Sequence, residues 1–282
     1  MAQTHVLVLQ GPLEITGIDP VLQHMYPDTL NRSHVWVKYD CRTNIRYLSM
    51  AFRAKGFKIC YSGWNEDREW LEANRECFDY LAISDQSDLR SHSIRNGVYI
   101  SNNKEKMFYA AQAGLEAVAA QEEPDTVIFR LRSDVAINQE LVAQEVTRVQ
   151  PGSGLILVEY LNLDNILLIP DFMIVGELST LLPLYNDLTE RCRTNTSYHI
   201  SAHIDIGITL VKMKLSGAAQ AVQCMSKACF DSSVWKGVPR YFEYMYRSEH
   251  RFFDGGLSVP EGFDVDAILA QIPEANRGAE PQ

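Results

Sequence analysis

Short apolar runs alternate with longer amphipathic stretches over the first half of the chain. Each run has the length of a strand and ends in glycine, proline or a polar loop, which is typical of buried strands. The longer stretches carry apolar residues at helical spacing. The predicted strands are His5–Gln10, Phe57–Ser62, Phe78–Ile83 and Thr126–Leu131, and the predicted helices are 42–55, 65–77 and 103–120. Because strands and helices alternate, we predict βαβ crossovers and an α/β fold with a mostly parallel sheet.

The pattern changes after Gly152, where short apolar runs follow one another with few residues between them. Such runs favour hairpins or a smaller mixed sheet, and two helical stretches come after them. The runs are Leu155–Val158, Ile166–Ile169 and Phe172–Val175, and the helices are Glu177–Arg191 and Ala202–Leu215. We predict one domain over residues 1–255, with halves 1–150 and 151–255, followed by an extended tail over 256–282.

The amino-acid composition and net charge exclude some classes of function. Of the 282 residues, 46% are hydrophobic and 22% are charged, which predicts a globular protein with a sizeable core. The net charge of −10 argues against a nucleic-acid partner, because a surface for many phosphates needs clustered Lys and Arg. That charge is still compatible with one small anionic ligand in a local basic pocket.

The cysteines and the first residues of the chain indicate the cellular compartment of the protein. The six cysteines form no C-x-x-C pair and are best interpreted as reduced core thiols, so we predict no zinc site and no disulfide framework. The start of the chain shows neither a signal peptide nor a membrane-spanning run. We therefore expect a cytoplasmic protein without a transmembrane segment, which is compatible with peripheral membrane association.

Candidate chemistry gathers in the loops that follow the four predicted strands. Ligands of open α/β sheets bind beyond the carboxyl ends of the strands, and three of these four loops carry carboxylates. The loop Arg132-Ser133-Asp134 is the most informative, because strand alternation places Arg130, Arg132 and Asp134 on one side. A carboxylate beside guanidinium groups suits a metal-bridged diphosphate. The alternatives are an Arg–Asp ion pair that closes the strand and loop acids that cap turns.

Several segments, taken in order, resemble the WavE-type lipopolysaccharide-synthesis proteins, a bacterial family with the GT-A glycosyltransferase fold. The resemblance covers about residues 5–190 and includes an Asp171-Phe172 and Gly176-Glu177 block. The other segments that carry it are 7–12, 61–67, 83–85, 102–115 and 129–134. The resemblance implies a nucleotide-sugar-binding first half, an acceptor-binding second half, and a mostly parallel sheet with a smaller mixed sheet and C-terminal helices.

The resemblance also assigns roles to residues of the first half. Gly11 and Pro12 would shape the loop under the nucleoside, Trp64 would flank it, and Asp85 would contact uracil or ribose. Asn103 and Lys104 would approach the donor phosphates or sugar, Arg132 would contact phosphate, and Asp134 would bind the nucleotide sugar through a metal ion.

Asp134 matches the last acid of the D-x-D motif, which binds manganese or magnesium in that fold. Arg132 stands where the motif has its first acid, so the metal would be held by one carboxylate and phosphate, or Arg132 would take over part of its role. His203 is a candidate further ligand, four residues after His199. The alternative for His203 is a structural histidine.

An inverting transfer needs a carboxylate that deprotonates the acceptor hydroxyl, and the candidates are Asp171, Glu177 and Asp205. Aromatic and basic residues over 234–247 either line an acceptor groove or pack into the core. The predicted function is transfer of a sugar from a nucleotide-sugar donor to a lipopolysaccharide or capsular glycan, or to a glycolipid. Two alternatives are a catalytically inactive nucleotide-sugar-binding protein and a nucleotidyltransferase, although the Gly-rich signature of the latter is missing.

Overall fold

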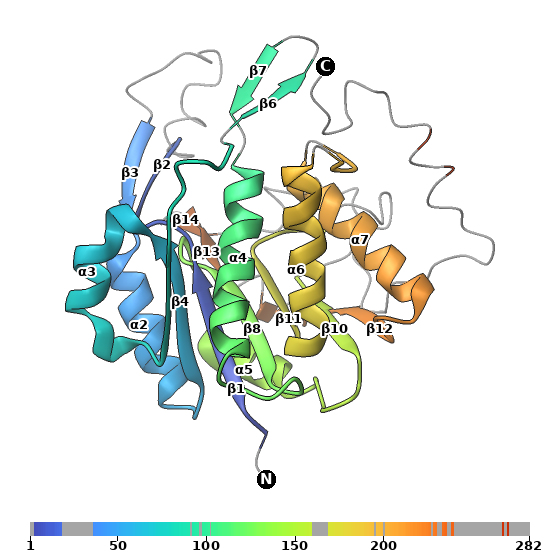
Figure 1. Cartoon of the computed structure of the whole chain (residues 1–282). Coiled ribbons are helices and arrows are strands. Elements are labelled where there is room, and N and C mark those ends of the chain that lie inside the picture. Colours follow the sequence, from blue (N-terminus) through green and yellow to red (C-terminus); the bar gives the residue numbers. More distant parts are fainter. Residues whose placement is uncertain are drawn as a thin grey trace.

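Seven strands form the central sheet of the computed structural model, and helices cover both of its faces (Figure 1). The strand order is β12-β10-β11-β8-β1-β4-β5, and β1, β4, β5 and β8 run parallel. These strands are β1 (His5–Gln10), β4 (Lys58–Trp64), β5 (Tyr80–Ser84), β8 (Val127–Arg132), β10 (Leu155–Val158), β11 (Met173–Glu177) and β12 (Ala221–Cys224). The α/β fold with a mostly parallel sheet is confirmed, and the four strands predicted in the first half lie within two residues of their expected bounds.

The structure describes residues 3–18, 36–90, 92–95, 98–101, 103–159, 169–194, 196–199, 201–226, 228–229, 233–235, 238–239, 267 and 270. Most of the predicted tail 256–282 and most of the aromatic and basic stretch 234–247 lie outside these ranges, as does most of the run Ile166–Ile169. None of the helices within the described ranges is long and apolar enough to cross a membrane.

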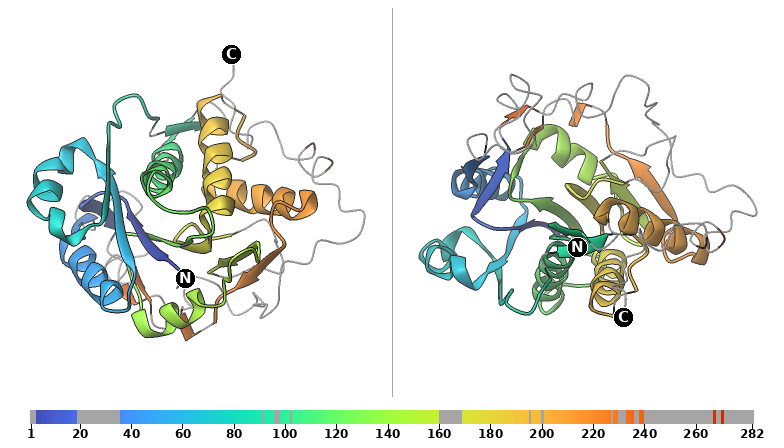
Figure 2. Two further views of the ribbon diagram at one scale, coloured as in Figure 1. Left: turned by 60° about the horizontal axis from the view of Figure 1, so that its bottom comes forward. Right: turned by 90° about the horizontal axis from the view of Figure 1, so that it is seen from above.

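Strand alternation divides the core into two layers. In β1, Val6 and Val8 pack against one set of helices, while Leu7 and Leu9 pack against the other. Figure 2 shows α4 and α6 side by side on the first face, whereas α2 and α5 cover the second. The helices are α2 (Arg42–Arg53), α3 (Arg68–Ala73), α4 (Lys104–Ala119), α5 (Gln139–Val146), α6 (Leu178–Arg193) and α7 (Ala202–Ser216).

Three strands of the second half of the chain extend the same sheet. β11 pairs antiparallel with both β8 and β10, and β12 pairs parallel with β10. The described runs that were expected to form a smaller mixed sheet therefore belong to the main sheet. A smaller sheet does exist, but it joins β9 to two later short strands in antiparallel pairing. Its members are β9 (Val135–Ala136), β13 (Val234–Trp235) and β14 (Val238–Pro239).

Two hairpins without a sequence prediction stand at the carboxyl edge of the parallel strands, drawn at the top of Figure 1. One pairs β2 (Glu14–Ile18) with β3 (Trp36–Asp40), and the other pairs β6 (His92–Arg95) with β7 (Val98–Ser101). Each hairpin follows a parallel strand or precedes α4. Together with the loops, they build up the edge at which ligands of such sheets bind.

Candidate functional site

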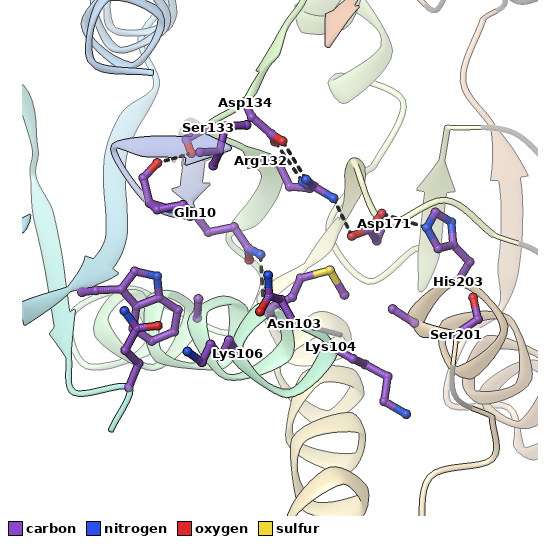
Figure 3. A pocket seen from close by; sticks show the side chains of 18 residues that line it. Gln10, Asn103, Lys104, Lys106, Arg132, Ser133, Asp134, Asp171, Ser201 and His203 are labelled. Carbon is purple, nitrogen blue, oxygen red and sulfur yellow. Dashed lines mark hydrogen bonds and ion pairs between the residues drawn. The ribbon is translucent and has the colours of Figure 1, made fainter. Parts of the chain in front are cut away.

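A pocket of about 740 Å³ opens at the carboxyl ends of the parallel strands (Figure 3). That volume lies within the usual range of small-molecule sites. The last residues of β1, β4 and β8 and the loops after β1, β5 and β8 contribute Gln10, Gly11, Pro12, Trp64, Gln86, Arg132, Ser133 and Asp134, and β2 contributes Ile15. The start of α4 contributes Asn103, Lys104, Lys106, Met107 and Ala110, and the far wall consists of Asp171, Ser201, Ala202 and His203. The strand-end rule therefore predicted the place of the pocket correctly.

The floor of the pocket depends on a tight contact between two loops. Gly11 has φ +124°, and a Cβ at this position would lie 2.8 Å from Ser133 Oγ. Ser133 Oγ donates to Pro12 O at 3.2 Å, and Tyr61 Oη donates to Gly11 O at 2.6 Å. Gly11 and Pro12 thus line the pocket, and the hydrogen bonds from Tyr61 and Ser133 hold their backbone carbonyl groups in place.

Arg132 lies between two carboxylates. Its Nε and Nη2 donate to Asp134 Oδ1 and Oδ2 at 2.9 and 2.7 Å, and its Nη1 donates to Asp171 Oδ2 at 3.0 Å. Both acids are buried, whereas 27% of the Arg132 side chain is exposed. Burial lowers the pKa of Arg132, but Asp134 and Asp171 outweigh that effect and raise it. The guanidinium therefore stays charged at the pocket wall.

Three basic side chains surround Asp171. His203 Nε2 lies 3.3 Å from its Oδ1, and Arg130 donates to its backbone carbonyl. Burial raises the pKa of Asp171, but the charges of Arg132, His203 and Arg130 together hold it below its usual value. Arg130 itself is fully buried, and its Nε donates to Gln10 Oε1 at 3.0 Å. Arg130 therefore links two residues of the pocket lining, Gln10 and Asp171.

Lys104 lines the pocket but directs its ammonium group away from the centre (Figure 3). Lys104 Nζ donates to Asp205 Oδ2 and to His199 O, each at 2.7 Å. Both side chains of this ion pair are buried, and burial raises the pKa of Asp205 more than Lys104 lowers it. Lys104 and Asp205 thus fasten α4 to α7, and Asp205 is not part of the pocket lining.

Two helices begin at the pocket. Asn103 is the N-cap of α4 and Ser201 is the N-cap of α7, and neither side chain caps its helix through a hydrogen bond. A helix N-terminus carries partial positive charge and exposed N–H groups, which favour anions. Lys106 adds a full charge next to them, and its ammonium group makes no ion pair with any residue that the structure describes. The pocket is therefore suited to a small polyanion.

The structure brings together most of the residues predicted from sequence. Those in the pocket lining are Gly11, Pro12, Trp64, Asn103, Lys104, Arg132, Asp134, Asp171 and His203. Trp64 is largely buried and stacks on Tyr109 of α4, with ring centroids 6.5 Å apart. Little of the Trp64 side chain is therefore left for a ligand.

Three predicted residues lie elsewhere. Asp85 is exposed and accepts a hydrogen bond from Ser87 N at 2.8 Å, so it caps a turn, and that bond lowers its pKa. Glu177 pairs with Val127 at the opposite end of the sheet, where it accepts from Gly154 N at 3.2 Å. Asp85, Glu177 and Asp205 therefore lie outside the pocket lining, so the roles predicted for them have no place in this pocket.

Sequence reasoning missed several residues of the lining. Lys106, Met107 and Ala110 follow Asn103 at intervals of three, four and seven, which places them on one face of α4. Helical spacing from Asn103 would therefore have found them. Gln10 and Ser133 adjoin predicted residues, whereas Ser201 and Ala202 carried no signal beyond the start of a helix.

The predicted metal site does not fit the donor set at this position. Both oxygens of Asp134 accept hydrogen bonds from Arg132, and Asp171 Oδ2 accepts a third hydrogen bond from the same guanidinium group. His199 Nδ1 accepts from Ser201 N at 2.9 Å, so it does not join His203 as a ligand. The part of the chain that the structure describes holds no group of three or more His, Cys, Asp or Glu arranged for a metal ion.

No protein-family model matches the sequence, and no curated protein sequence matches it. Among solved structures, the chain is similar to the apo form of mouse xyloside xylosyltransferase 1, at 13% sequence identity and a TM-score of 0.36. The similarity covers 76% of this chain and 82% of that chain. The resemblance to the WavE-type family thus stays a prediction, and what the pocket binds is inferred from its own side chains.

Proposed function

We propose that the chain is a glycosyltransferase that takes a sugar from a nucleotide-sugar donor. The observation that supports this most is the convergence of Arg132, Lys106 and two helix N-termini at the carboxyl edge of a parallel sheet. That edge is where α/β folds bind nucleotides, and the N–H donors of these groups suit the oxygens of a diphosphate. The proposed acceptor is a lipopolysaccharide or capsular glycan, or a glycolipid reached from the cytoplasmic face of a membrane.

The lining suggests how the donor lies. The nucleoside would occupy the side of Trp64 and Gln86, an aromatic and an amide side chain of the lining. The diphosphate would lie at the start of α4, between Lys106 and Arg132. The transferred sugar would then point toward Asp171 and His203 on the far wall.

Departure of the nucleoside diphosphate develops negative charge, so groups placed at that point stabilise the transition state. Arg132 is held in place by Asp134 and Asp171 before any ligand binds. Of the three carboxylates considered as acceptor base, Asp171 is the one that lines the pocket. We assign it the role of general base, with His203 Nε2 at 3.3 Å from its Oδ1.

Incubation of the purified protein with a panel of nucleotide sugars tests this function. We expect at least one donor to raise the melting temperature and to be hydrolysed slowly without acceptor. Asp171→Asn should lower turnover by about 10²- to 10⁴-fold while donor binding is kept. The matched control is Asp85→Asn, which changes an exposed turn acid outside the pocket. If no nucleotide sugar stabilises the protein, the proposal is wrong.

A second candidate function is nucleotide-sugar binding without catalysis. The substitution of arginine for the first acid of D-x-D favours it, because Arg132 also keeps both acids paired. Donor binding without hydrolysis or transfer, across acceptors with free hydroxyl groups, would support this candidate over the enzyme.

A further inference from the structure

We infer that Arg132 and Lys106 bind the donor diphosphate directly, in place of a divalent cation, so that nucleotide binding at this site needs no metal. This inference rests on the proposed function and specifies how its site holds the donor. It also replaces the metal role predicted for Asp134 and His203, which the donor set does not support.

Arg132 carries its positive charge at the pocket wall, between Asp134 and Asp171. Three of its N–H groups are used, one for each hydrogen bond to Asp134 and Asp171. A guanidinium has five N–H donors, which leaves two for phosphate oxygens. Its side chain is 27% exposed on the pocket side, so a ligand can reach it. Arginine also suits phosphate because its planar fork can donate two parallel hydrogen bonds.

Asp134 positions Arg132 and is not available as a metal ligand. Both of its oxygens face the guanidinium at hydrogen-bond distance, and 4% of its side chain is exposed. A magnesium or calcium ion needs about six oxygen ligands. Recruiting Asp134 would break two charge-assisted bonds and leave Arg132 facing the incoming cation, which like-charge repulsion opposes.

Lys106 supplies the second charge. Lys104, two residues earlier, is neutralised by Asp205, whereas Lys106 makes no ion pair with the described residues and lines the pocket. Both lie in the first turn of α4, whose N-terminus adds to the positive potential. Arg132 and Lys106 therefore approach a diphosphate from β8 and from α4.

Binding of a nucleoside diphosphate tests the inference. The probes are UDP and GDP, titrated calorimetrically at constant ionic strength, once with EDTA and once with Mn²⁺. We expect the Kd of the bound nucleotide to differ by less than about threefold between the two conditions. Lys106→Ala should raise that Kd by about tenfold, the effect of losing one charged hydrogen bond. Lys214→Ala is the matched control, because Lys214 is also a half-buried lysine on a helix but lies outside the pocket.

Arg132→Asp provides the reciprocal test, because it places a carboxylate two residues before Asp134. This variant should lose nucleotide binding in EDTA, bind in Mn²⁺, and gain a Mn²⁺-dependent rise in melting temperature that the natural protein lacks. If the variant does not fold, the EDTA and Mn²⁺ titrations of the natural protein and of Lys106→Ala still decide.

The outcomes separate the two proposals. Binding by the natural protein that requires Mn²⁺ would overturn the inference and leave the proposed glycosyltransferase intact. Equal binding with an unchanged Kd for Lys106→Ala would overturn the role of that lysine. Absence of binding by either nucleotide, together with no stabilisation by any nucleotide sugar, would overturn both.

Discussion

At Gly11, both the backbone conformation and the packing around it disfavour any side chain. Its φ of +124° lies in a region that L side chains rarely adopt, and Ser133 Oγ occupies the space where a Cβ would go. We predict that Gly11→Ala lowers the free energy of unfolding by about 2–4 kcal/mol, from backbone strain plus the clash. Urea unfolding of this variant and of the natural protein measures the change in the free energy of unfolding.

Two further variants separate these causes. Gly152 has φ +73°, and no atom lies within 4 Å of the place that a Cβ would take, so Gly152→Ala should cost only the strain, about 1 kcal/mol. Adding Ser133→Ala to Gly11→Ala should recover part of the loss. If Gly11→Ala costs no more than Gly152→Ala, the contact with Ser133 does not matter.

At Arg132 the sequence left a choice that only the structure could make. Alternation along the strand correctly predicted that Arg132 and Asp134 face the same side. The spacing could not show Asp171, which is 39 residues away and brought alongside by the pairing of β11 with β8. The alternative of an Arg–Asp ion pair is confirmed, and this pair stands at the wall of a pocket, whereas the diphosphate interpretation stays a prediction.

The junction of α4 and α7 shows how two helices position one site. The Lys104–Asp205 pair is buried at the start of both helices, so removal of one partner leaves an uncompensated charge. We predict that Lys104→Met lowers the free energy of unfolding by about 3–5 kcal/mol. The double variant Lys104→Met/Asp205→Leu should be more stable than Lys104→Met, because no charge stays buried alone. Urea unfolding of both variants measures the difference.

The same variants test whether this pair serves position or ligand contact. In the double variant, nucleotide binding should weaken less than in Lys106→Ala, since the ammonium of Lys104 is directed away from the pocket. Calorimetric titration with UDP or GDP compares them. A larger loss in the double variant would assign Lys104 a direct contact with the ligand.

Elements with strong periodicity were predictable, and elements without it were not. The apolar stripe of α4 located that helix within a residue of its observed start at Lys104. The hairpins β2–β3 and β6–β7 carry no such period, and their partners are set by loops that a local pattern does not describe. α5 was missed for a similar reason, because its eight residues bury only Val142 and Val146.

Across the whole molecule, the position of the pocket could be predicted and its composition could not. A rule about parallel sheets identified the correct edge from the order of strands and helices alone. Which residues of the second half reach that edge depends on the reversal of β11 between β8 and β10. That reversal brings Asp171 into the pocket and carries Glu177 to the opposite edge, since the two lie on either side of one antiparallel strand.

The buried charges of this pocket should also govern the acid stability of the fold. Because the folded-state pKa of Asp171 lies below its usual value, the ionised carboxylate stabilises the protein above the unfolded pKa of about 4. That contribution is lost as the pH falls through the folded pKa. Asp171→Asn should therefore lower the free energy of unfolding by about 1–3 kcal/mol at pH 7 and flatten its decline between about pH 4 and pH 2. Urea unfolding across that range measures both effects.

Asp187→Asn, which removes an exposed i, i+4 ion pair with Arg191, should change the unfolding free energy at pH 7 by less than about 0.5 kcal/mol. An acid slope for Asp171→Asn equal to that of the natural protein would mean that another group controls acid unfolding.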